Sequence, residues 1–359
     1  GDLKTGDKYM IRKDEGLGFI LKYENVAWYE GGKVKILDRR IYPTQISFVT
    51  CATHEEVAKA IADMVTQSAG PYTAAGMGMA LAAYEIRNES KKKQLEYLEK
   101  AAYTLSHARP TTVNRMKLIT SGCLEVARKA LDNGEQVDEK IFNFTIDSLN
   151  RRYENMEVVG NYLVDMFPNK GTIMTQCFGE TIVGMMLKQA KNRNKDIRVF
   201  VPETRPYFQG ARLTASVSQD QGFDTTVITD NMPAFVMKTN KIDLFTSAAD
   251  VICLDGHITN KIGTYQLAIT AKYHEVPYFV TGIPDIDNPT VDTVKIEERD
   301  PALVLEARGI KNTLDGVKGY YPSFDITPPH LISGVVTNKG IYSPYDLKRY
   351  FESDVKKFY

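Results

Sequence analysis

The chain has 359 residues, 43% of them hydrophobic and 25% charged, which is a composition typical of a globular enzyme. Its 45 Lys and Arg residues balance 45 Asp and Glu residues, and this argues against a protein that wraps nucleic acid or coats an anionic membrane. No run of about 18 apolar residues occurs, so we expect no transmembrane helix. Because the charged start of the sequence lacks the apolar core of a signal peptide, we expect a cytoplasmic protein without nucleic-acid or membrane partners.

Metal and cofactor motifs are missing from the sequence. The four cysteines form no CxxC pair, and no two of the five histidines have the spacing of a metal site. The sequence has no GxGxxG, Walker, HExxH or GxSxG motif in a suitable context. We therefore predict free thiols, no metal ion and no organic cofactor.

The first part of the chain is predicted to form short strands and then helices. Residues 17–50 are rich in β-branched and aromatic residues, which favours strands, with a turn at Glu30-Gly31-Gly32. Thr53 and Glu56 are spaced as a capping box at the start of a helix. Residues 74–150 are mostly helical in pattern, so we expect an N-terminal domain over residues 1–150.

From about residue 171 short apolar runs alternate with helical segments. This alternation predicts a Rossmann-like, doubly wound parallel sheet in a second domain, residues 151–359. Ligands of such sheets bind beyond the carboxyl ends of the strands. The polar residues at predicted strand ends are Cys177, Glu203, Asp230 and Asp250.

Long motifs in the second domain resemble one family. VPETRPYFQGARLTA (201–215), VITDNMPAFVMK (227–238) and TNKIGTYQLAI (259–269) are similar to the methylthioribose-1-phosphate isomerase family. Its superfamily includes ribose-1,5-bisphosphate isomerases and the regulatory subunits of the guanine-exchange translation initiation factor. ARPTTVN (108–114), VKIEERDP (294–301) and YPSFDITPPHLISGVVTNKGIY (321–342) extend the resemblance over nearly the whole chain.

The resemblance implies both a fold and an activity. The family fold is a domain of strands and helices followed by a Rossmann-like domain, usually as a homodimer, in agreement with the pattern above. The family reaction is an intramolecular isomerisation of an aldose 1-phosphate to the ketose 1-phosphate. Its partner is a small-molecule sugar phosphate, and the expected setting is methionine salvage or 5-deoxyribose salvage.

Two catalytic residues carry over from the family. Cys177 ends the first strand of the second domain, and Asp250, preceded by Ala249, falls in the family's aspartate position. We expect a helix N-terminus or a cation to lower the pKa of the Cys177 thiol, so that it shuttles a proton between adjacent carbons. We expect burial to raise the pKa of Asp250, so that it protonates the ring oxygen. The sequence leaves proton and hydride transfer open, and without the family Cys177 would be interpreted as a core thiol.

Other residues are expected to bind the substrate. Arg109 matches a phosphate-binding arginine, the Asn260-Lys261 pair precedes a helix whose N–H groups can face an anion, and Gln209 matches a contact to sugar hydroxyls. Gln67 and Ser68 occupy the place of a further binding loop. Arg205 lies in the same motif as Gln209 and is expected equally to brace the loop or to touch substrate.

Two departures from the family pattern leave the substrate open. Gln67-Ser68-Ala69-Gly70-Pro71 replaces the usual Arg-Gly-Ala-Pro run, so a phosphate-binding cation is expected to be lost. Gln176-Cys177-Phe178 replaces a more polar run around the thiol and predicts a more apolar pocket. Three alternatives remain: a methylthioribose-1-phosphate isomerase, a 5-deoxyribose-1-phosphate isomerase, and a non-catalytic regulatory protein that binds a sugar phosphate or nucleotide.

Overall fold

The computed structural model describes residues 3–5, 8–10 and 12–352. The chain divides into unit 1, Gly1–Glu154, and unit 2, Asn155–Tyr359, and the division falls within helix α6 (Val137–Asp165). The predicted boundary at residues 150 and 151 lies in the same helix. Among the described residues, no helix combines the length and the apolar character needed to cross a membrane.

The strands of unit 1 form two small antiparallel sheets. The first pairs β1 (Leu3–Thr5) with β2 (Lys8–Met10), and the second has the order β3 (Trp28–Glu30), β4 (Lys33–Leu37) and β5 (Phe48–Cys51). Gly31 and Gly32 join β3 to β4 with φ angles of 57° and 78°. Since most L-residues avoid such angles, the predicted turn needs its glycines.

Residues 19–26 depart from the strand prediction. They form a 3-10 turn, η1 (Phe19–Leu21), and a short helix, α1 (Tyr23–Val26). The Asp14 carboxylate accepts a hydrogen bond from the Tyr23 N–H at 2.9 Å, and the Asn25 side chain donates to the Phe19 carbonyl at 2.8 Å. These local polar contacts favour helical turns over the strand that the apolar composition indicated.

Five helices and a 3-10 turn complete unit 1. They are α2 (His54–Ala62), α3 (Gly70–Glu85), α4 (Lys91–Ser106), η2 (Pro110–Thr112), α5 (Val113–Asp132) and the first part of α6. The predicted cap of α2 is confirmed, because the Thr53 hydroxyl accepts from the Glu56 N–H at 3.2 Å. The Glu56 carboxylate accepts in turn from the Ala52 N–H at 2.7 Å.

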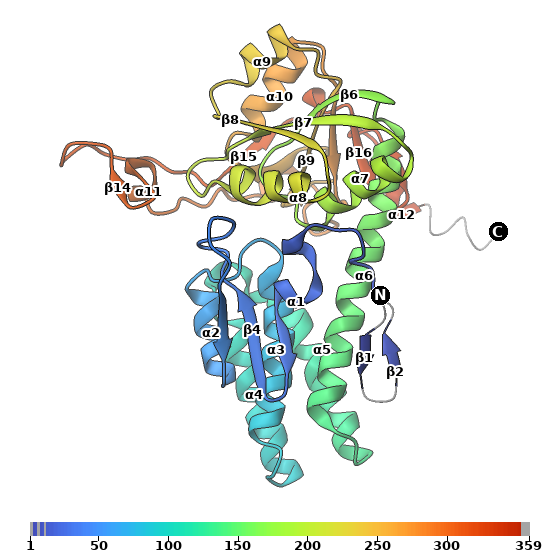
Figure 1. Ribbon diagram of the computed structural model, residues 1–359, viewed down its shortest axis with the longest axis vertical. Helices are drawn as coiled ribbons and strands as arrows, with labels where there is room; N and C mark the ends of the chain where they lie inside the picture. Colours follow the sequence, from blue (N-terminus) through green and yellow to red (C-terminus); the bar gives the residue numbers. More distant parts are fainter. Residues whose placement is uncertain (1–2, 6–7, 11, 353–359) are drawn as a thin grey trace. The chain divides into compact units, whose positions relative to one another are not determined.

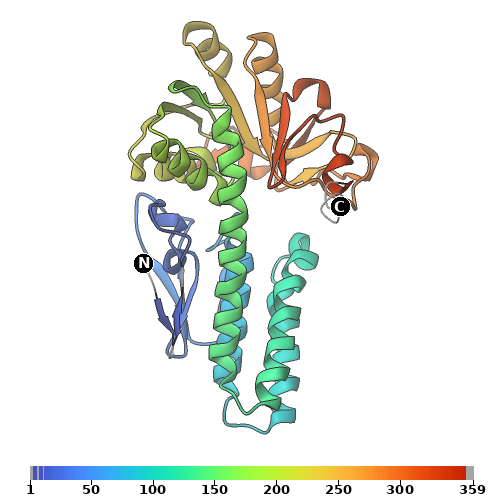
Figure 2. The same ribbon diagram turned by 90° about the vertical axis from the view of Figure 1, so that its right-hand side faces the viewer.

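Close helix packing in unit 1 depends on glycine. An added Cβ on Gly76 of α3 would lie 2.5 Å from the Thr145 hydroxyl of α6, and one on Gly122 of α5 would lie 2.4 Å from the Phe144 ring. Figure 2 shows α6 as one long, nearly straight helix. Its residues at this level therefore fill the space that the two glycines leave.

Unit 2 is built on a seven-stranded sheet. The strand order is β17 (Gly340–Tyr342), β16 (Gly334–Thr337), β12 (Tyr278–Thr281), β9 (Leu244–Ala248), β6 (Lys170–Met174), β7 (Asp196–Pro202) and β8 (Asp224–Ile228). All neighbours are parallel except the edge pair of β16 and β17. The prediction of a mostly parallel, doubly wound sheet is confirmed.

The helices of unit 2 cover the sheet in two groups. On one side α7 (Thr181–Asn192) packs against α8 (Ala215–Asp220), which follows a π-helical turn, η3 (Gly210–Thr214). On the other side α9 (Pro233–Thr239) packs against α10 (Thr264–Tyr273) (Figure 1). The inner strands β9 and β12 are buried between them, as the stacked rings of Phe245 and Tyr278 with centroids 4.3 Å apart illustrate.

The winding direction reverses between β6 and β9. From β6 the chain adds β7 and then β8 on one side, and it returns to add β9, β12 and β16 on the other. A second, antiparallel sheet begins directly after β9 and consists of β10 (Val251–Ile252), β11 (Ile258–Lys261) and β15 (Phe324–Thr327). The reversal lies between β6 and β9, and sheets of this type bind ligands beyond the carboxyl ends of the strands at such a point.

Short elements make up the rest of unit 2. They are η4 (Val291–Thr293), α11 (Ala302–Leu305), β13 (Glu306–Ala307), β14 (Ile310–Lys311), η5 (Pro329–Leu331) and α12 (Arg349–Glu352). The arm between β12 and β15 is anchored by Arg205, whose guanidinium donates to the Glu306 carbonyl at 2.8 Å and the Leu303 carbonyl at 3.3 Å. Arg205 therefore braces this arm.

Candidate active site

Cys177 and Asp250 follow the two strands that flank the winding reversal. Cys177 lies three residues beyond β6 and is half-buried, and Asp250 lies two residues beyond β9 and is exposed. Glu203 and Asp230 follow the neighbouring strands β7 and β8. All four residues lie at the carboxyl edge of the sheet, as the strand pattern indicated.

The pKa of the Cys177 thiol lies above that of an ordinary thiol. Burial raises its pKa to about 11, and the Asp250 and Asp230 carboxylates act in the same direction. The Lys261 ammonium and a hydrogen bond from the Phe178 N–H oppose the increase. The expected fall of the pKa toward neutrality is therefore wrong, because burial outweighs the nearby cation.

Lys261 is the buried cation of this site. Its side chain is in a residue only 5% exposed, and its ammonium lies 3.4 Å from the Tyr321 hydroxyl. The ammonium also faces the rings of Tyr207, Tyr321 and Phe324, 5.6, 5.9 and 5.1 Å from their centroids. Burial lowers the pKa of Lys261, whereas Cys177 and Asp250 raise it, so the three groups interact electrostatically.

Asp250 is positioned by the second sheet. Its N–H donates to the Thr259 carbonyl at 2.8 Å, where β10 and β11 pair. The expected desolvation of its carboxyl group is wrong, because Asp250 lies beyond the last buried residue of β9, Ser247, and is exposed.

Gln209 and Asn260 are the other expected ligands in unit 2. Gln209 directly precedes η3, and its buried Oε1 has no hydrogen-bond partner among the described residues. Such an oxygen is free to accept from a hydroxyl group. Asn260 is buried on β11, and its amide donates to the Thr264 hydroxyl at 3.1 Å, at the start of α10.

Three residues near the thiol were not predicted from the sequence. Tyr207, Arg299 and Tyr321 surround Lys261, and the Arg299 guanidinium lies 5.5 Å from the Phe324 ring centroid. Burial raises the pKa of Tyr321 to about 12 although Arg299 opposes the increase. Arg299 and Tyr321 lie in the motifs VKIEERDP and YPSFD, whose resemblance to the family was the only available signal.

A cleft of about 530 Å³ opens beside the site, at the N-terminus of α10. Its polar lining residues are Gln176, Arg205, Asp230, Tyr265, Gln266, Thr270 and Asp325. The Asp325 carboxylate accepts hydrogen bonds from the N–H groups of Gly263 at 2.8 Å and Tyr265 at 3.1 Å. Burial nevertheless raises its pKa to about 6. Asp325 therefore caps α10. Gln176, which directly precedes Cys177, brings this cleft next to the residue that carries the thiol.

Arg109 lies in unit 1 and is half-buried. Its Nε donates to the Ile61 carbonyl at 2.7 Å, and its Nη2 donates to the Thr66 carbonyl. Of the two residues that follow Thr66, Gln67 is buried and Ser68 is exposed with a φ of 60°. Arg109 thus holds the segment that contains both of these expected ligands.

The loop at Gln67 is not without positive charge. The Arg39 guanidinium, in a fully buried residue, donates to the Gln67 carbonyl at 2.6 Å. Arg152 of α6 donates to the Ala69 carbonyl at 3.5 Å, and its Nε and Nη2 are buried with no hydrogen-bond partner among the described residues. Position 67 is neutral, but guanidinium groups from other elements surround the loop.

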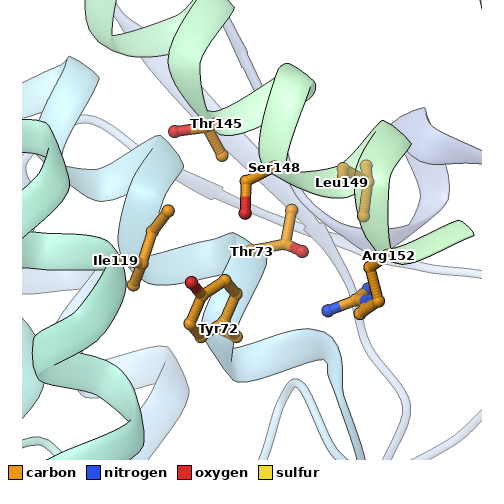
Figure 3. A pocket seen from close by; sticks show the side chains of 7 residues that line it. All are labelled: Tyr72, Thr73, Ile119, Thr145, Ser148, Leu149 and Arg152. Atoms are coloured by element: carbon orange, nitrogen blue, oxygen red, sulfur yellow. The ribbon is translucent and has the colours of Figure 1, made fainter. Parts of the chain in front are cut away.

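A narrow cavity lies beneath the start of α3, between α3, α5 and α6 (Figure 3). Its lining residues are Tyr72, Thr73, Ile119, Thr145, Ser148, Leu149 and Arg152. The cavity is too small for a water molecule, so it is a packing gap and not a ligand site.

One group of side chains in unit 1 has the geometry of a metal site. Ligand atoms of His54, Glu55 and Glu85 all lie within 4.8 Å of one another. His54 Nδ1 lies 3.1 Å from the Glu85 carboxylate, which also accepts from the Tyr97 hydroxyl at 2.5 Å. The side chains of His54, Glu85 and Tyr97, from α2, α3 and α4, therefore satisfy one another's hydrogen-bonding groups.

The geometry defines a doubly wound α/β protein with a thiol and a carboxylate at its switch point and a buried lysine beside them. The sequence matches the Initiation factor 2 subunit family over residues 67–344, more than half of the chain. The chain belongs to this family, and the predicted relationship is confirmed.

Known relatives cover almost the full chain. A methylthioribose-1-phosphate isomerase of Thermosipho africanus is 33% identical over 92% of this chain and 99% of its own length. The crystal structure of 5-methylthioribose 1-phosphate isomerase from Pyrococcus horikoshii is similar, with a TM-score of 0.82, 30% identity and coverage of 93% and 97% of the two chains. Translation initiation factor eIF-2B subunit delta from A. fulgidus has a TM-score of 0.78, 30% identity and coverage of 89% and 96%.

Proposed function

We propose that the protein converts methylthioribose 1-phosphate to the corresponding ketose 1-phosphate, with Asp250 as the acid that protonates the ring oxygen and Cys177 as the base at carbon 2. The chain is a sugar-phosphate isomerase by class, as relatives 33% to 34% identical over nearly its whole length indicate. The observation that supports the two residues most directly is their position. They flank the switch point of the sheet and share an electrostatic neighbour in Lys261.

The isomerisation needs four proton movements that cancel. The C1–O4 bond breaks with its electrons on the ring oxygen, which takes a proton from Asp250. Cys177 removes the hydrogen from C2 and returns it to C1, while the C2 hydroxyl gives its proton back to Asp250 and becomes the carbonyl. Both side chains end as they began, so no other reactant is required. A hydride shift from C2 to C1 would use only the Asp250 steps.

The buried residues around the thiol suit this chemistry. In the proposed complex the Lys261 ammonium stabilises the thiolate and the negative charge that develops on oxygen. The free Oε1 of Gln209 accepts from a sugar hydroxyl, and Asn260 contacts the substrate beside Lys261. In unit 1, Arg109, Gln67 and Ser68 are proposed to contribute to phosphate binding, with Arg109 also holding the loop.

The substituent on carbon 5 is the open part of this proposal. The names of the relatives favour methylthioribose 1-phosphate. The buried Phe178 beside the thiol, in place of a polar family residue, leaves 5-deoxyribose 1-phosphate as an alternative because a terminal methyl group tolerates an apolar wall. We also propose a cytoplasmic homodimer that acts in methionine salvage, or in 5-deoxyribose salvage if that substrate is preferred.

Turnover of both sugar phosphates, followed by proton NMR as loss of the anomeric signal, tests the proposal. We expect conversion of at least one substrate, and a loss of kcat of about 100-fold or more in Cys177→Ser and Asp250→Asn with the fold retained. Cys253→Ser is the matched control for the thiol, since Cys253 is a buried cysteine outside the site. No conversion by folded, reduced protein would contradict the proposal.

A second candidate has an observation of its own. The similarity to a protein described as an initiation factor subunit favours a regulatory member that binds a sugar phosphate or nucleotide without turnover. Such a protein would gain thermal stability with a sugar phosphate or nucleotide, convert neither substrate, and be indifferent to Cys177→Ser.

A further inference from the structure

The backbone of Cys177 has an unusual conformation. Its φ is 56°, in the left-handed region that a residue with a Cβ rarely occupies. Glycine and asparagine adopt this conformation more readily, but position 177 is a cysteine. Such backbone strain persists only where surrounding contacts enforce it, so the contacts of this peptide identify what holds the thiol.

Two threonine hydroxyls hold the peptide of Cys177 from both sides. The Cys177 N–H donates to Thr204 Oγ1 at 3.2 Å, and the Cys177 carbonyl accepts from the Thr214 hydroxyl. Both threonines are fully or almost fully buried, with exposed fractions of 1% and 0%. Neither lies near Cys177 in sequence, since Thr204 follows β7 and Thr214 ends η3.

Thr204 is itself fixed by its neighbours. Its hydroxyl donates to the Pro202 carbonyl at 3.3 Å, which leaves an oxygen lone pair directed to the Cys177 N–H. The Asp230 carboxylate accepts from the Thr204 N–H at 2.9 Å and from the Arg205 N–H at 2.7 Å. A chain of hydrogen bonds therefore runs from the end of β8, through the turn after β7, to the residue after β6.

The backbone conformation of Cys177 decides what its sulfur contacts. The dihedral angles of Cys177 fix the direction of its Cα–Cβ bond and therefore the position of the sulfur at the end of β6. If the hydroxyl of Thr204 were lost, the strained backbone could relax and move the sulfur relative to the groups around it, such as Lys261.

We propose that Thr204 and Thr214 are positioning residues for the thiol, and that Asp230 fixes Thr204 in turn. The two hydroxyls hold the Cys177 peptide in the left-handed conformation that fixes the position of the sulfur. This inference deepens the proposed isomerase function and rests on it for its effect on turnover. Its effect on thiol reactivity does not depend on any substrate.

The test compares Thr204→Val, which keeps the shape of the side chain and removes the hydroxyl, with Thr204→Ser, which keeps the hydroxyl. Thr120→Val is the matched control, because Thr120 is a buried threonine of α5 whose hydroxyl bonds to its own helix. One readout is the pH dependence of Cys177 alkylation by iodoacetamide, measured on the Cys177 peptide by mass spectrometry. The other is kcat and KM for methylthioribose 1-phosphate and 5-deoxyribose 1-phosphate.

In Thr204→Val we expect kcat to fall about 10- to 100-fold with KM changed less than about 3-fold, since a slightly misplaced group loses that much. The alkylation profile should move to higher pH because the displaced sulfur loses part of the influence of Lys261 and the Phe178 N–H, which lower its pKa. Thr204→Ser and Thr120→Val should match the unaltered protein in both readouts. An unchanged alkylation profile in Thr204→Val, or equal impairment of Thr204→Ser, would overturn the positioning role.

Two further outcomes are separable. If the unaltered protein converts neither substrate, the isomerase proposal fails, while the alkylation profiles still decide the role of Thr204. If Thr204→Val does not fold, Thr214→Val carries the same two readouts. Unfolding of both valine variants would show a purely structural role and overturn the proposal.

Discussion

The ammonium of Lys261 lies 3.4 Å from the hydroxyl of Tyr321, inside a ring of three aromatic side chains. A cation buried in this way loses much of its hydration, and burial lowers the pKa of Lys261 accordingly. Cys177 and Asp250 act in the opposite direction and raise the pKa of Lys261, which offsets part of the effect of burial. Lys261 and Cys177 are thus mutually dependent, and changing one should alter the titration of the other.

Lys261→Met should make the Cys177 thiol less acidic, because Lys261 is the largest influence that lowers its pKa. We expect alkylation of Cys177 at pH 8 to slow by about tenfold, the effect of one pKa unit. Lys318→Met, at an exposed position of unit 2, is the control. Equal alkylation rates in the two variants would show that Lys261 does not act on the thiol.

Alkylation of Cys177 should rise steeply with pH. With a thiol pKa of about 11, only about one molecule in ten thousand carries the thiolate at pH 7, and this fraction grows about tenfold per pH unit up to pH 10. We therefore expect the alkylation rate to increase about tenfold per pH unit between pH 7 and pH 9. The kcat/KM value should rise much less, because the proposed reaction also needs a proton on Asp250, which is lost as the pH rises. An alkylation rate that does not change between pH 7 and pH 9 would contradict the high pKa of the thiol.

Gly76→Ala should destabilise unit 1 despite the better helix propensity of alanine. The propensity gain is about 1 kcal/mol, but the new Cβ would lie 2.5 Å from Thr145 Oγ1 and 2.6 Å from its methyl group. Overpacking of a buried contact costs about 1–3 kcal/mol, so the free energy of unfolding should fall by up to about 2 kcal/mol. Urea denaturation of the variant measures this change.

The double variant Gly76→Ala with Thr145→Ala separates the clash from other effects. Removing the Thr145 hydroxyl and methyl group opens the space that the new Cβ needs. Gly76→Ala should therefore lower the free energy of unfolding less when Thr145 is already alanine than when it is threonine. Additive changes in the free energy of unfolding would show that the two residues do not meet.

Much of the fold could be predicted because its signals are local. The strand and helix alternation after residue 171, the Thr53 cap and the Gly31-Gly32 turn all depend on nearby residues. The strand prediction for residues 19–26 was wrong because the signal that decides their structure is not in the hydrophobic pattern. Their apolar composition favours a strand, but Asp14 and Asn25 satisfy helical backbone groups that the pattern does not reveal.

The place of the candidate residues in the fold was predictable, but their electrostatics were not. The strand pattern placed Cys177 and Asp250 at the carboxyl edge of the sheet, where the structure has them. The burial that raises the thiol pKa and the exposure of Asp250 depend on residues distant in sequence, such as Lys261. The guanidinium groups of Arg39 and Arg152 beside the Gln67 loop could not be predicted either, because Arg39 follows β4 and Arg152 lies in α6, both distant from the loop in sequence.

Arg109 offers a test of phosphate binding against loop support. Its two hydrogen bonds to the Ile61 and Thr66 carbonyls predict that Arg109→Ala lowers the melting temperature, since both carbonyls lose a charged donor. If Arg109 also binds phosphate, KM for the sugar phosphate should rise about 10- to 100-fold, equivalent to about 1.5–3 kcal/mol. Arg128→Ala, on the exposed side of α5, should change neither quantity appreciably.

Arg109→Lys separates the two roles, because lysine keeps the charge but cannot reproduce both directed hydrogen bonds. A phosphate-binding role predicts that KM recovers in this variant more than the melting temperature does. If the melting temperature and KM instead recover together, or if KM remains normal in Arg109→Ala, then Arg109 supports the loop and the phosphate is bound by other groups.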